Sequence, residues 1–178
     1  EDTDIRRLSL ETLRKNVGLV FQTPAPFPFS IYKNLTYAPV YYGIREKQKL
    51  AEIVEEKLKL TGLYEEVSGE LHKSALKLSG GQKQRLCIAR ALTVEPKVLL
   101  LDEPCSALDR KASAKIEELL LKLKRRYTIV IVTHNLAQAK RIADDVAFFQ
   151  DGRLVEAKDA KEFWENPEQE ETKEFLQG

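Results

Sequence analysis

The chain has 178 residues, of which 43% are hydrophobic and 32% are charged. This length suits one domain with a buried core, and the composition is typical of a globular rather than a disordered protein. The 29 basic and 28 acidic residues leave a net charge of +1, which gives no reason to propose nucleic acid or an anionic membrane as a partner. The apolar runs are strand-sized and far shorter than a membrane span, and no signal peptide is recognisable.

The first predicted elements are a short helix and a strand. Ser9 is expected to cap a helix over Ser9–Lys15, and the apolar run Val17–Phe21 is typical of a strand. Residues 23–29 carry three prolines at alternating positions, which remove donors and fix an extended backbone. The two phenylalanines of this loop are either packed inward or offered to a partner.

A helical pattern begins at residue 31 and continues to residue 92. Leu50, Val54 and Leu58 lie one turn apart with charged residues between them, which is the spacing of an amphipathic helix. We therefore expect an inserted helical region.

The two cysteines, Cys87 and Cys105, show no spacing of metal ligands and are expected to be reduced, half-buried hydrophobic residues, which favours a reducing compartment.

Strands and helices alternate after residue 97. The run Val98–Leu101 is apolar throughout, as expected of a strand covered on both faces. The next helix carries apolar residues at i, i+4, i+7, i+8 and i+11, namely Ala112, Ile116, Leu119, Leu120 and Leu123. The later predicted elements are the strand Thr128–Thr133, a short helix after Asn135, a hairpin of Val146–Gln150 and Arg153–Val155 about the turn Asp151-Gly152, and two short helices. This alternation predicts an α/β fold with a mostly parallel sheet flanked by helices.

The segment Leu78-Ser79-Gly80-Gly81-Gln82 is one of two informative motifs. Ser79 can cap a helix that begins about Gly80, and the two glycines let the backbone approach a ligand closely. The free N–H groups and the helix dipole at such an N-terminus suit a phosphate, and Gln82 adds an amide. The alternative is a Gly-Gly turn before an ordinary helix, which the five matching residues and the sequence of the following helix disfavour.

The second motif is the pair Asp102 and Glu103, which follows four apolar residues. It lies at the carboxyl end of a buried strand, where open α/β sheets gather their ligands. Asp102 can hold Mg²⁺ through water, and Glu103 beside it can polarise an attacking water. The alternative is a strand that ends in two solvated acids before a proline, and the position shortly after the first motif argues against it.

Three single residues complete the set of candidates. Asp109 in Ser106-Ala107-Leu108-Asp109 can also serve as the N-cap of the following helix. His134 follows a predicted strand, and a lone histidine usually satisfies local hydrogen bonds. Gln22 follows the first strand and could equally be an exposed polar residue. His134 and Gln22 become candidates only because they stand in a fixed order along the chain with the other motifs.

In this order and spacing the motifs resemble the ATPase subunits of ABC transporters. The resemblance implies that residues 78–82 form the signature loop, that Val98–Pro104 is the Walker B strand, and that Asp109 belongs to the D-loop. It also implies that His134 is the switch histidine, which contacts the γ-phosphate, and that Gln22 is the Q-loop glutamine, which approaches the metal and senses the membrane partner. Glu103 and His134 would then be catalytic, and Asp102 and Gln22 would serve the metal.

Finer details resemble one branch, the ATPase subunits of bacterial phosphate importers. These details are Val20-Phe21-Gln22 followed by Pro-Phe-Pro, Phe29-Ser30-Ile31-Tyr32, Arg85-Leu86-Cys87-Ile88-Ala89-Arg90, Thr128-Ile129-Val130-Ile131-Val132-Thr133-His134-Asn135 and Ala147-Phe148-Phe149. One residue departs from the family: Cys105 stands where the family commonly has Thr, a mild departure that is not expected to abolish the chemistry.

The resemblance implies a P-loop NTPase fold with a RecA-like α/β core over residues 1–30 and 92–178 and a helical subdomain over residues 31–91. No G-x-x-x-x-G-K-S/T phosphate loop occurs in the 178 residues, although the family carries one upstream. The chain also contains no Met and opens with Glu1. We therefore expect a chain whose front section has been cut away, and a core that lacks central strand and helix material.

In the family, two such subunits sandwich two ATP molecules, so the resemblance implies ATP and Mg²⁺ as cofactors. The implied partners are a second ATPase subunit and transmembrane permease subunits, at the cytoplasmic face of the cell membrane. Without a phosphate loop the chain is predicted not to hydrolyse ATP alone, and its exposed apolar sheet surface predicts self-association. Two alternatives stay open: an ABC-type ATPase that serves no transporter, as in DNA repair or translation, and a non-catalytic module that regulates intact subunits.

Overall fold

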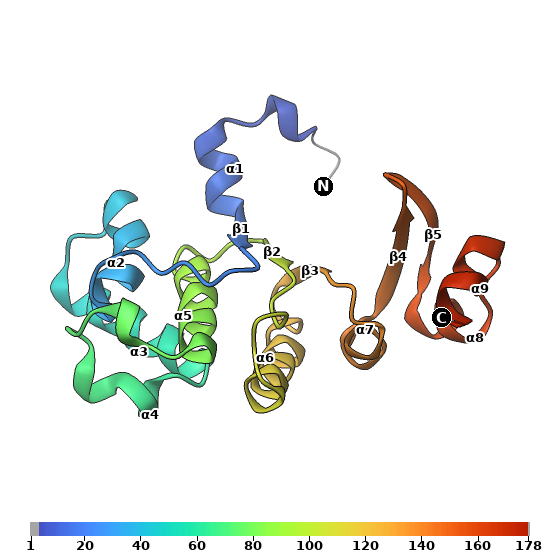
Figure 1. The fold of residues 1–178 in the computed structure, drawn as a ribbon. Coiled ribbons are helices and arrows are strands. Elements are labelled where there is room, and N and C mark those ends of the chain that lie inside the picture. Colours follow the sequence, from blue (N-terminus) through green and yellow to red (C-terminus); the bar gives the residue numbers. More distant parts are fainter. Residues whose placement is uncertain (1–3, 178) are drawn as a thin grey trace. The chain divides into compact units, whose positions relative to one another are not determined.

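The computed structural model describes residues 4–177, so residues 1–3, on which the expectation of a cut start rests in part, lie outside it. The chain divides into two compact units, Glu1–Val132 and Thr133–Gly178. The helices of the first unit are α1 (Leu10–Asn16), α2 (Ile31–Tyr41), α3 (Lys47–Leu60), α4 (Tyr64–Val67), α5 (Gly80–Leu92) and α6 (Arg110–Leu123), and its strands are β1 (Val17–Val20), β2 (Val98–Asp102) and β3 (Thr128–Val132) (Figure 1). The second unit holds α7 (Leu136–Ile142), β4 (Asp145–Gln150), β5 (Arg153–Asp159), α8 (Ala160–Glu165) and α9 (Glu170–Gln177).

The first unit is built on a three-stranded parallel sheet in the order β1-β2-β3, which confirms the parallel arrangement predicted for these strands. Gly18 pairs with Leu99, and Leu99 pairs with Ile129, so the three residues share one face. A Cβ on Gly18 would lie 3.3 Å from the Cβ of Ala91 on α5. The glycine therefore permits α5 to pack tightly on this face, and α5 and α6 lie on the same side of the sheet (Figure 1).

The opposite face of the sheet is partly uncovered. Leu19 pairs with Leu100, which pairs with Val130, and these side chains point away from the face that α5 covers. Leu19 and Val130 are each 49% exposed, and Val132 is 61% exposed. This agrees with the expected exposure of apolar sheet surface.

Helices α2 to α5 enclose a second core, as the pattern of residues 31–92 predicts. Leu35 of α2, Leu58 of α3 and Leu86 of α5 are all fully buried in it. Helix α5 thus has one face in the helical core and another, with Ala91, against the sheet. The N-terminus of α5 lies against α6, because a Cβ at Gly81 would come within 3.0 Å of the Ala112 Cβ.

A buried lysine joins this helical region to the loops before the sheet strands. The Lys57 side chain on α3 is 1% exposed and forms ion pairs with Glu56, at 2.8 Å, and with Glu95. Glu95 also accepts hydrogen bonds from the Tyr127 hydroxyl at 2.8 Å and from the Arg126 guanidinium at 2.9 Å. These contacts satisfy the charge of a lysine that would otherwise be costly to bury.

In the second unit, β4 and β5 form an antiparallel hairpin, as the turn at Asp151-Gly152 predicts. Strand β5 continues to Asp159, beyond the predicted end at Val155, because its residues remain paired with β4 up to Asp145. Glu156 of β5 is 6% exposed and accepts hydrogen bonds from the backbone N–H groups of Glu168 and Gln169. The two residues directly before α9 are therefore tied to the hairpin.

Both cysteines are free, with Cys87 buried and Cys105 of intermediate exposure, as expected for small hydrophobic residues. Burial raises the pKa of the Cys87 thiol, which keeps it protonated and unreactive. Within residues 4–177, none of the helices combines the length and the apolar character needed to cross a membrane.

Candidate functional site

The tip of α5 carries a complete capping box, as the serine in the first motif predicts. The backbone N–H of Gln82 donates to Ser79 Oγ at 3.3 Å, and the backbone N–H of Ser79 donates to Gln82 Oε1 at 2.9 Å. The side chain of Gln82 therefore returns to its own helix. The N–H groups of Gly80 and Gly81 lie in the first turn, where no intrahelical acceptor is available to them.

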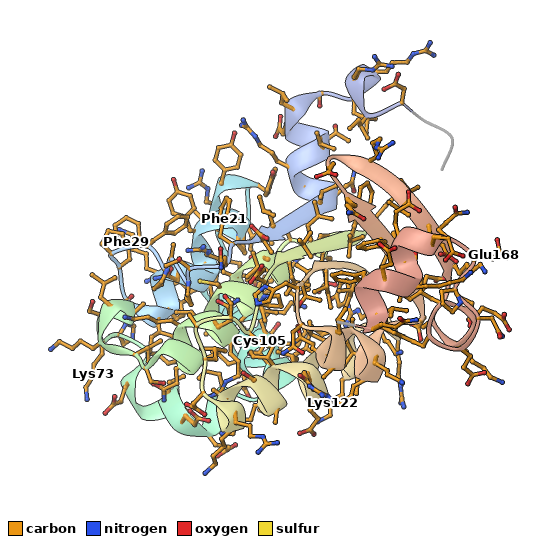
Figure 2. All side chains as sticks on the ribbon, turned by 45° about the vertical axis from the view of Figure 1, so that its right-hand side comes forward. Phe21, Phe29, Lys73, Cys105, Lys122 and Glu168 are labelled. Carbon is orange, nitrogen blue, oxygen red and sulfur yellow. The ribbon has the colours of Figure 1, made fainter. Side chains whose placement is uncertain are left out.

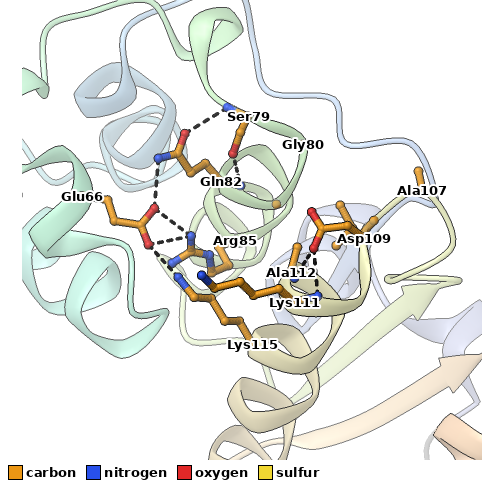
Figure 3. Close-up of a pocket in the computed structure, with 12 residues that line it drawn as sticks. Glu66, Ser79, Gly80, Gln82, Arg85, Ala107, Asp109, Lys111, Ala112 and Lys115 are labelled. Carbon is orange, nitrogen blue, oxygen red and sulfur yellow. Dashed lines mark hydrogen bonds and ion pairs between the residues drawn. The ribbon is translucent and has the colours of Figure 1, made fainter.

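Glu66, the penultimate residue of α4, binds three side chains around this tip. Its carboxylate accepts from Gln82 Nε2 at 3.0 Å, from Arg85 at 2.9 Å to each oxygen, and from Lys115 at 3.2 Å (Figure 3). Burial opposes the ionisation of Glu66, but the hydrogen bonds from Gln82, Arg85 and Lys115 hold the pKa of its carboxyl below the usual value. The group is therefore an anion at neutral pH.

The second element at the site is the N-terminus of α6. Asp109 is its N-cap, and one carboxylate oxygen accepts from the N–H groups of Lys111 at 2.8 Å and Ala112 at 2.9 Å. A Cβ added at Gly81 would come within 3.0 Å of the Ala112 Cβ. The second glycine of the motif is therefore needed for close contact between α5 and α6.

These two helix tips open onto one pocket of about 310 Å³. Helices α5 and α6 have 13 and 14 residues, so both present a positive dipole end to it. Three cationic side chains line the same pocket, namely Arg85, Lys111 and Lys115, against the anions Glu66 and Asp109 (Figure 3). Two converging N-termini with an excess of cations provide a favourable setting for an oxyanion.

The two acids of the second motif lie at the carboxyl edge of the sheet. Asp102 is the last residue of β2, and the N–H of Glu103 donates to Val132 O at 2.8 Å. Glu103 has φ +40°, a left-handed conformation that is strained for a residue other than glycine. Strain of this kind is concentrated at functional sites. Gln22 lies two residues beyond the end of β1 at the same edge and is exposed.

His134 lies two residues beyond the end of β3 in the chain and belongs to the second unit. It is exposed. Its neighbour Asn135 caps α7 by accepting from the N–H of Gln138 at 2.9 Å. Thr133 Oγ1 lies 3.1 Å from Gln138 Oε1, so the turn that carries the histidine has a defined local conformation.

The predicted residues thus form two groups in the first unit. Ser79 to Gln82 and Asp109 share the pocket between α5 and α6. Asp102 ends β2, and Gln22 and Glu103 come just after the ends of β1 and β2. Sequence reasoning missed Glu66, Lys111 and Lys115. Glu66 and Lys115 meet the site through contacts that span 16 to 49 residues of sequence, which no local pattern marks. Lys111 lies only two residues after Asp109, so its place beside that motif was the signal that could have found it.

Asp102 could serve as a carboxylate ligand of Mg²⁺. Within residues 4–177, no three His, Cys, Asp or Glu side chains gather as a metal cage. Mg²⁺ does not need one, because it is usually held by one or two carboxylates together with water and substrate phosphates. Asp102, exposed at the end of β2, can supply such a carboxylate.

The proline-rich loop before α2 presents an aromatic cluster. The rings of Phe27 and Phe29 lie 5.1 and 6.4 Å from that of Tyr37, which is 51% exposed (Phe29 is labelled in Figure 2). The fully buried Asn34 fixes the loop, because it accepts from Phe27 N at 2.8 Å and donates to Phe27 O at 3.1 Å. The two phenylalanines are therefore half-buried on a rigid loop, between the two predicted alternatives.

The model of the family described as ABC transporter matches residues 1–106 of the chain. The chain belongs to this family. It is similar to the phosphate import ATP-binding protein PstB 1 of Enterococcus faecalis (strain ATCC 700802 / V583), with 53% identity over 166 residues. That match covers 93% of this chain and 66% of the relative, so the chain spans less than two thirds of the relative's length.

Among solved structures, the chain resembles CbiO1 from Clostridium perfringens, a part of the ABC transporter complex CbiONQ. The TM-score is 0.78 at 32% identity, over 92% of this chain and 64% of that one. The α/β fold predicted from the resemblance to ABC ATPases is thereby confirmed.

Proposed function

We propose that the chain acts as the ATPase subunit of an ABC importer for inorganic phosphate. The observation that carries this proposal is the pocket between α5 and α6, where Ser79, Gly80 and Asp109 meet three cationic side chains. Identity of 53% with a phosphate import ATP-binding protein supports the choice of solute. The partner in hydrolysis is a second ATPase subunit.

In this proposal the α5 tip binds the terminal phosphates of an ATP that a second subunit holds on its phosphate loop. The free N–H groups of Gly80 and Gly81 and the hydroxyl of Ser79 donate to phosphate oxygens. Asp102 and Gln22 would hold Mg²⁺, which would neutralise phosphate charge. Glu103 accepts a proton from the attacking water, and His134 donates to the γ-phosphate.

We expect no hydrolysis by the chain alone, because the 178 residues contain no G-x-x-x-x-G-K-S/T motif. Charge-assisted hydrogen bonds contribute about 1.5–3 kcal/mol each. The absence of four such bonds removes about 6 kcal/mol, which corresponds to over four decades in affinity. The chain would therefore complete the site of a partner rather than bind ATP by itself.

The aromatic cluster of the proline-rich loop supports attachment to a permease, and hence a peripheral position at the cytoplasmic face of the membrane. Tyr37 of this cluster is 51% exposed, and Phe27 and Phe29 beside it are half-buried on the loop. Partly exposed aromatic residues of this kind are typical of interface anchors. An ABC-type ATPase that serves no transporter would not need this surface. Binding to detergent-solubilised permease separates the two functions, because only the importer subunit should bind. Tyr37→Ala should weaken this binding, and Tyr41→Ala, at a second exposed tyrosine outside the cluster, is the control.

The test of the site is complementation in trans. An intact subunit of the family, with a phosphate loop but with its own signature serine replaced by alanine, is mixed with this chain and its ATP hydrolysis is measured. The proposal expects the chain to restore turnover and the Ser79→Ala variant to restore at least tenfold less. Equal restoration by both, or none by either, contradicts it.

A further inference from the structure

We propose that Glu66 is a positioning residue of the α5 tip, which fixes the Gln82 amide and ties the tip to α6. The inference rests on the function proposed above, because the tip matters to catalysis only if it binds phosphate. Glu66 belongs to none of the motifs that define the family in this sequence. It contacts the motif from another helix, 16 residues before Gln82.

The contact with Gln82 determines which way its amide faces. Gln82 Oε1 accepts from the Ser79 N–H at 2.9 Å, while Nε2 donates to Glu66 at 3.0 Å. If the amide were reversed, its oxygen would face a carboxylate and its NH₂ would face an N–H donor. Glu66 therefore selects the one orientation in which the capping box closes.

The remaining contacts of Glu66 join three helices. Arg85 on α5 donates to both carboxylate oxygens at 2.9 Å and also to the Gly62 carbonyl at 2.6 Å. Lys115 on α6 reaches the same carboxylate at 3.2 Å. The arginine side chain is only 7% exposed, so its two bonds are shielded from solvent and hold the tip firmly.

Glu66 also sets the charge of the pocket. It faces Arg85 and Lys115 (Figure 3), so it balances two of the three cations and prevents them from drawing an anion to the side of the tip. Lys111, on the other hand, has no ion pair with the residues that the structure describes. Phosphate is thereby directed toward Ser79, Gly80 and Lys111.

The first test uses the chain by itself and measures amide hydrogen exchange by NMR. In Glu66→Ala the Ser79 N–H should exchange about tenfold faster. Its acceptor is Gln82 Oε1, and without Glu66 the amide of Gln82 is no longer held in place. The Ile88 N–H, deep in α5, should keep its rate. The control Glu65→Ala removes a neighbouring carboxylate that contacts no residue of the tip, and should change neither amide.

Glu66→Gln retains an oxygen that can accept from Gln82 Nε2, so it should restore most of the protection of Ser79. The proposal is overturned if the Ser79 N–H is unaffected by Glu66→Ala, or if Ser79 and Ile88 accelerate together, which would report global destabilisation. It is also overturned if Glu66→Gln behaves like Glu66→Ala.

The second test uses the complementation assay. Glu66→Ala should lower kcat about tenfold and leave the KM for ATP within about twofold, because a displaced tip weakens contacts made at the transition state. An unchanged kcat, with Ser79 exchange accelerated, overturns the catalytic part of the inference. If wild-type chain fails to complement at all, the proposed function fails, while the exchange measurement still decides the role of Glu66.

Discussion

Gly81 has little room for a side chain, because an added Cβ would lie 3.0 Å from the Ala112 Cβ. We predict that Gly81→Ala lowers the free energy of unfolding by about 1–3 kcal/mol through overpacking. Ala112→Gly removes the opposing methyl group at a cost of about 1 kcal/mol in helix stability. The double variant should therefore be more stable than the sum of the two changes, as measured by urea unfolding.

Gly69 provides the matched control for this cycle. A Cβ there would meet no atom within 4 Å, so Gly69→Ala should change stability by less than about 0.5 kcal/mol. Strict additivity of Gly81→Ala and Ala112→Gly would show that the two helices do not meet as described.

Helix caps are the residues of the site that sequence predicts best. Ser79 and Asp109 each satisfy N–H groups two or three residues away, so the relevant partner lies within the same short segment. Glu66 lies 16, 19 and 49 residues from its three partners. Its role depends on how α4, α5 and α6 pack, and no local pattern encodes that.

At the scale of elements, Glu156 links the β4–β5 hairpin to the start of α9. Burial opposes its ionisation, but hydrogen bonds from the N–H groups of Glu168 and Gln169 and from Lys158 lower its pKa to about 2. The side chain of an unperturbed glutamate has a pKa of about 4.3. The stabilisation is thus complete above about pH 5 and is lost as the pH falls toward 2.

We predict that Glu156→Gln lowers the stability of the second unit at pH 7 by about 1–3 kcal/mol and flattens its loss between pH 5 and 2.5. Trp164, the single tryptophan of the chain, lies in this unit and reports its unfolding by fluorescence. Glu165→Gln is the control, because Glu165 is an exposed carboxylate of the same unit and is not one of the groups that bond to Glu156. Parallel acid profiles of wild type and Glu156→Gln would refute the assignment.

Strand positions were predictable where the pattern was continuous. The apolar run at Val98 and the turn at Gly152 predicted β2 and β4 to within one residue of their observed limits. The length of β5 was not predictable, because its charged residues after Val155 are held by pairing with β4 rather than by an apolar pattern. For the same reason the burial of Lys57 could not be foreseen, since it depends on Glu95 from a distant loop.

At the scale of the whole molecule, the uncovered sheet face predicts association. Val130 and Val132 on the edge strand β3 are 49% and 61% exposed. Exposed apolar residues on a strand edge favour pairing between chains. We predict concentration-dependent oligomers by sedimentation and binding of a hydrophobic dye, both reduced in the variant Val130→Lys/Val132→Lys.

Leu121→Lys is the control for this prediction, because Leu121 is 39% exposed on α6 rather than on the sheet. It should leave association unchanged. A monodisperse wild-type monomer without dye binding would contradict the role of the sheet face.

We propose that the α5 tip and the pair Asp102–Glu103 act on one triphosphate shared between two subunits. The most direct test of this proposal is ATP hydrolysis by a fusion that places a phosphate-loop segment of the family before residue 1 of this chain. We expect turnover by the fusion, a loss of at least a hundredfold in kcat for Glu103→Gln, and retained ATP binding. Undiminished turnover by the Glu103→Gln fusion would contradict the account.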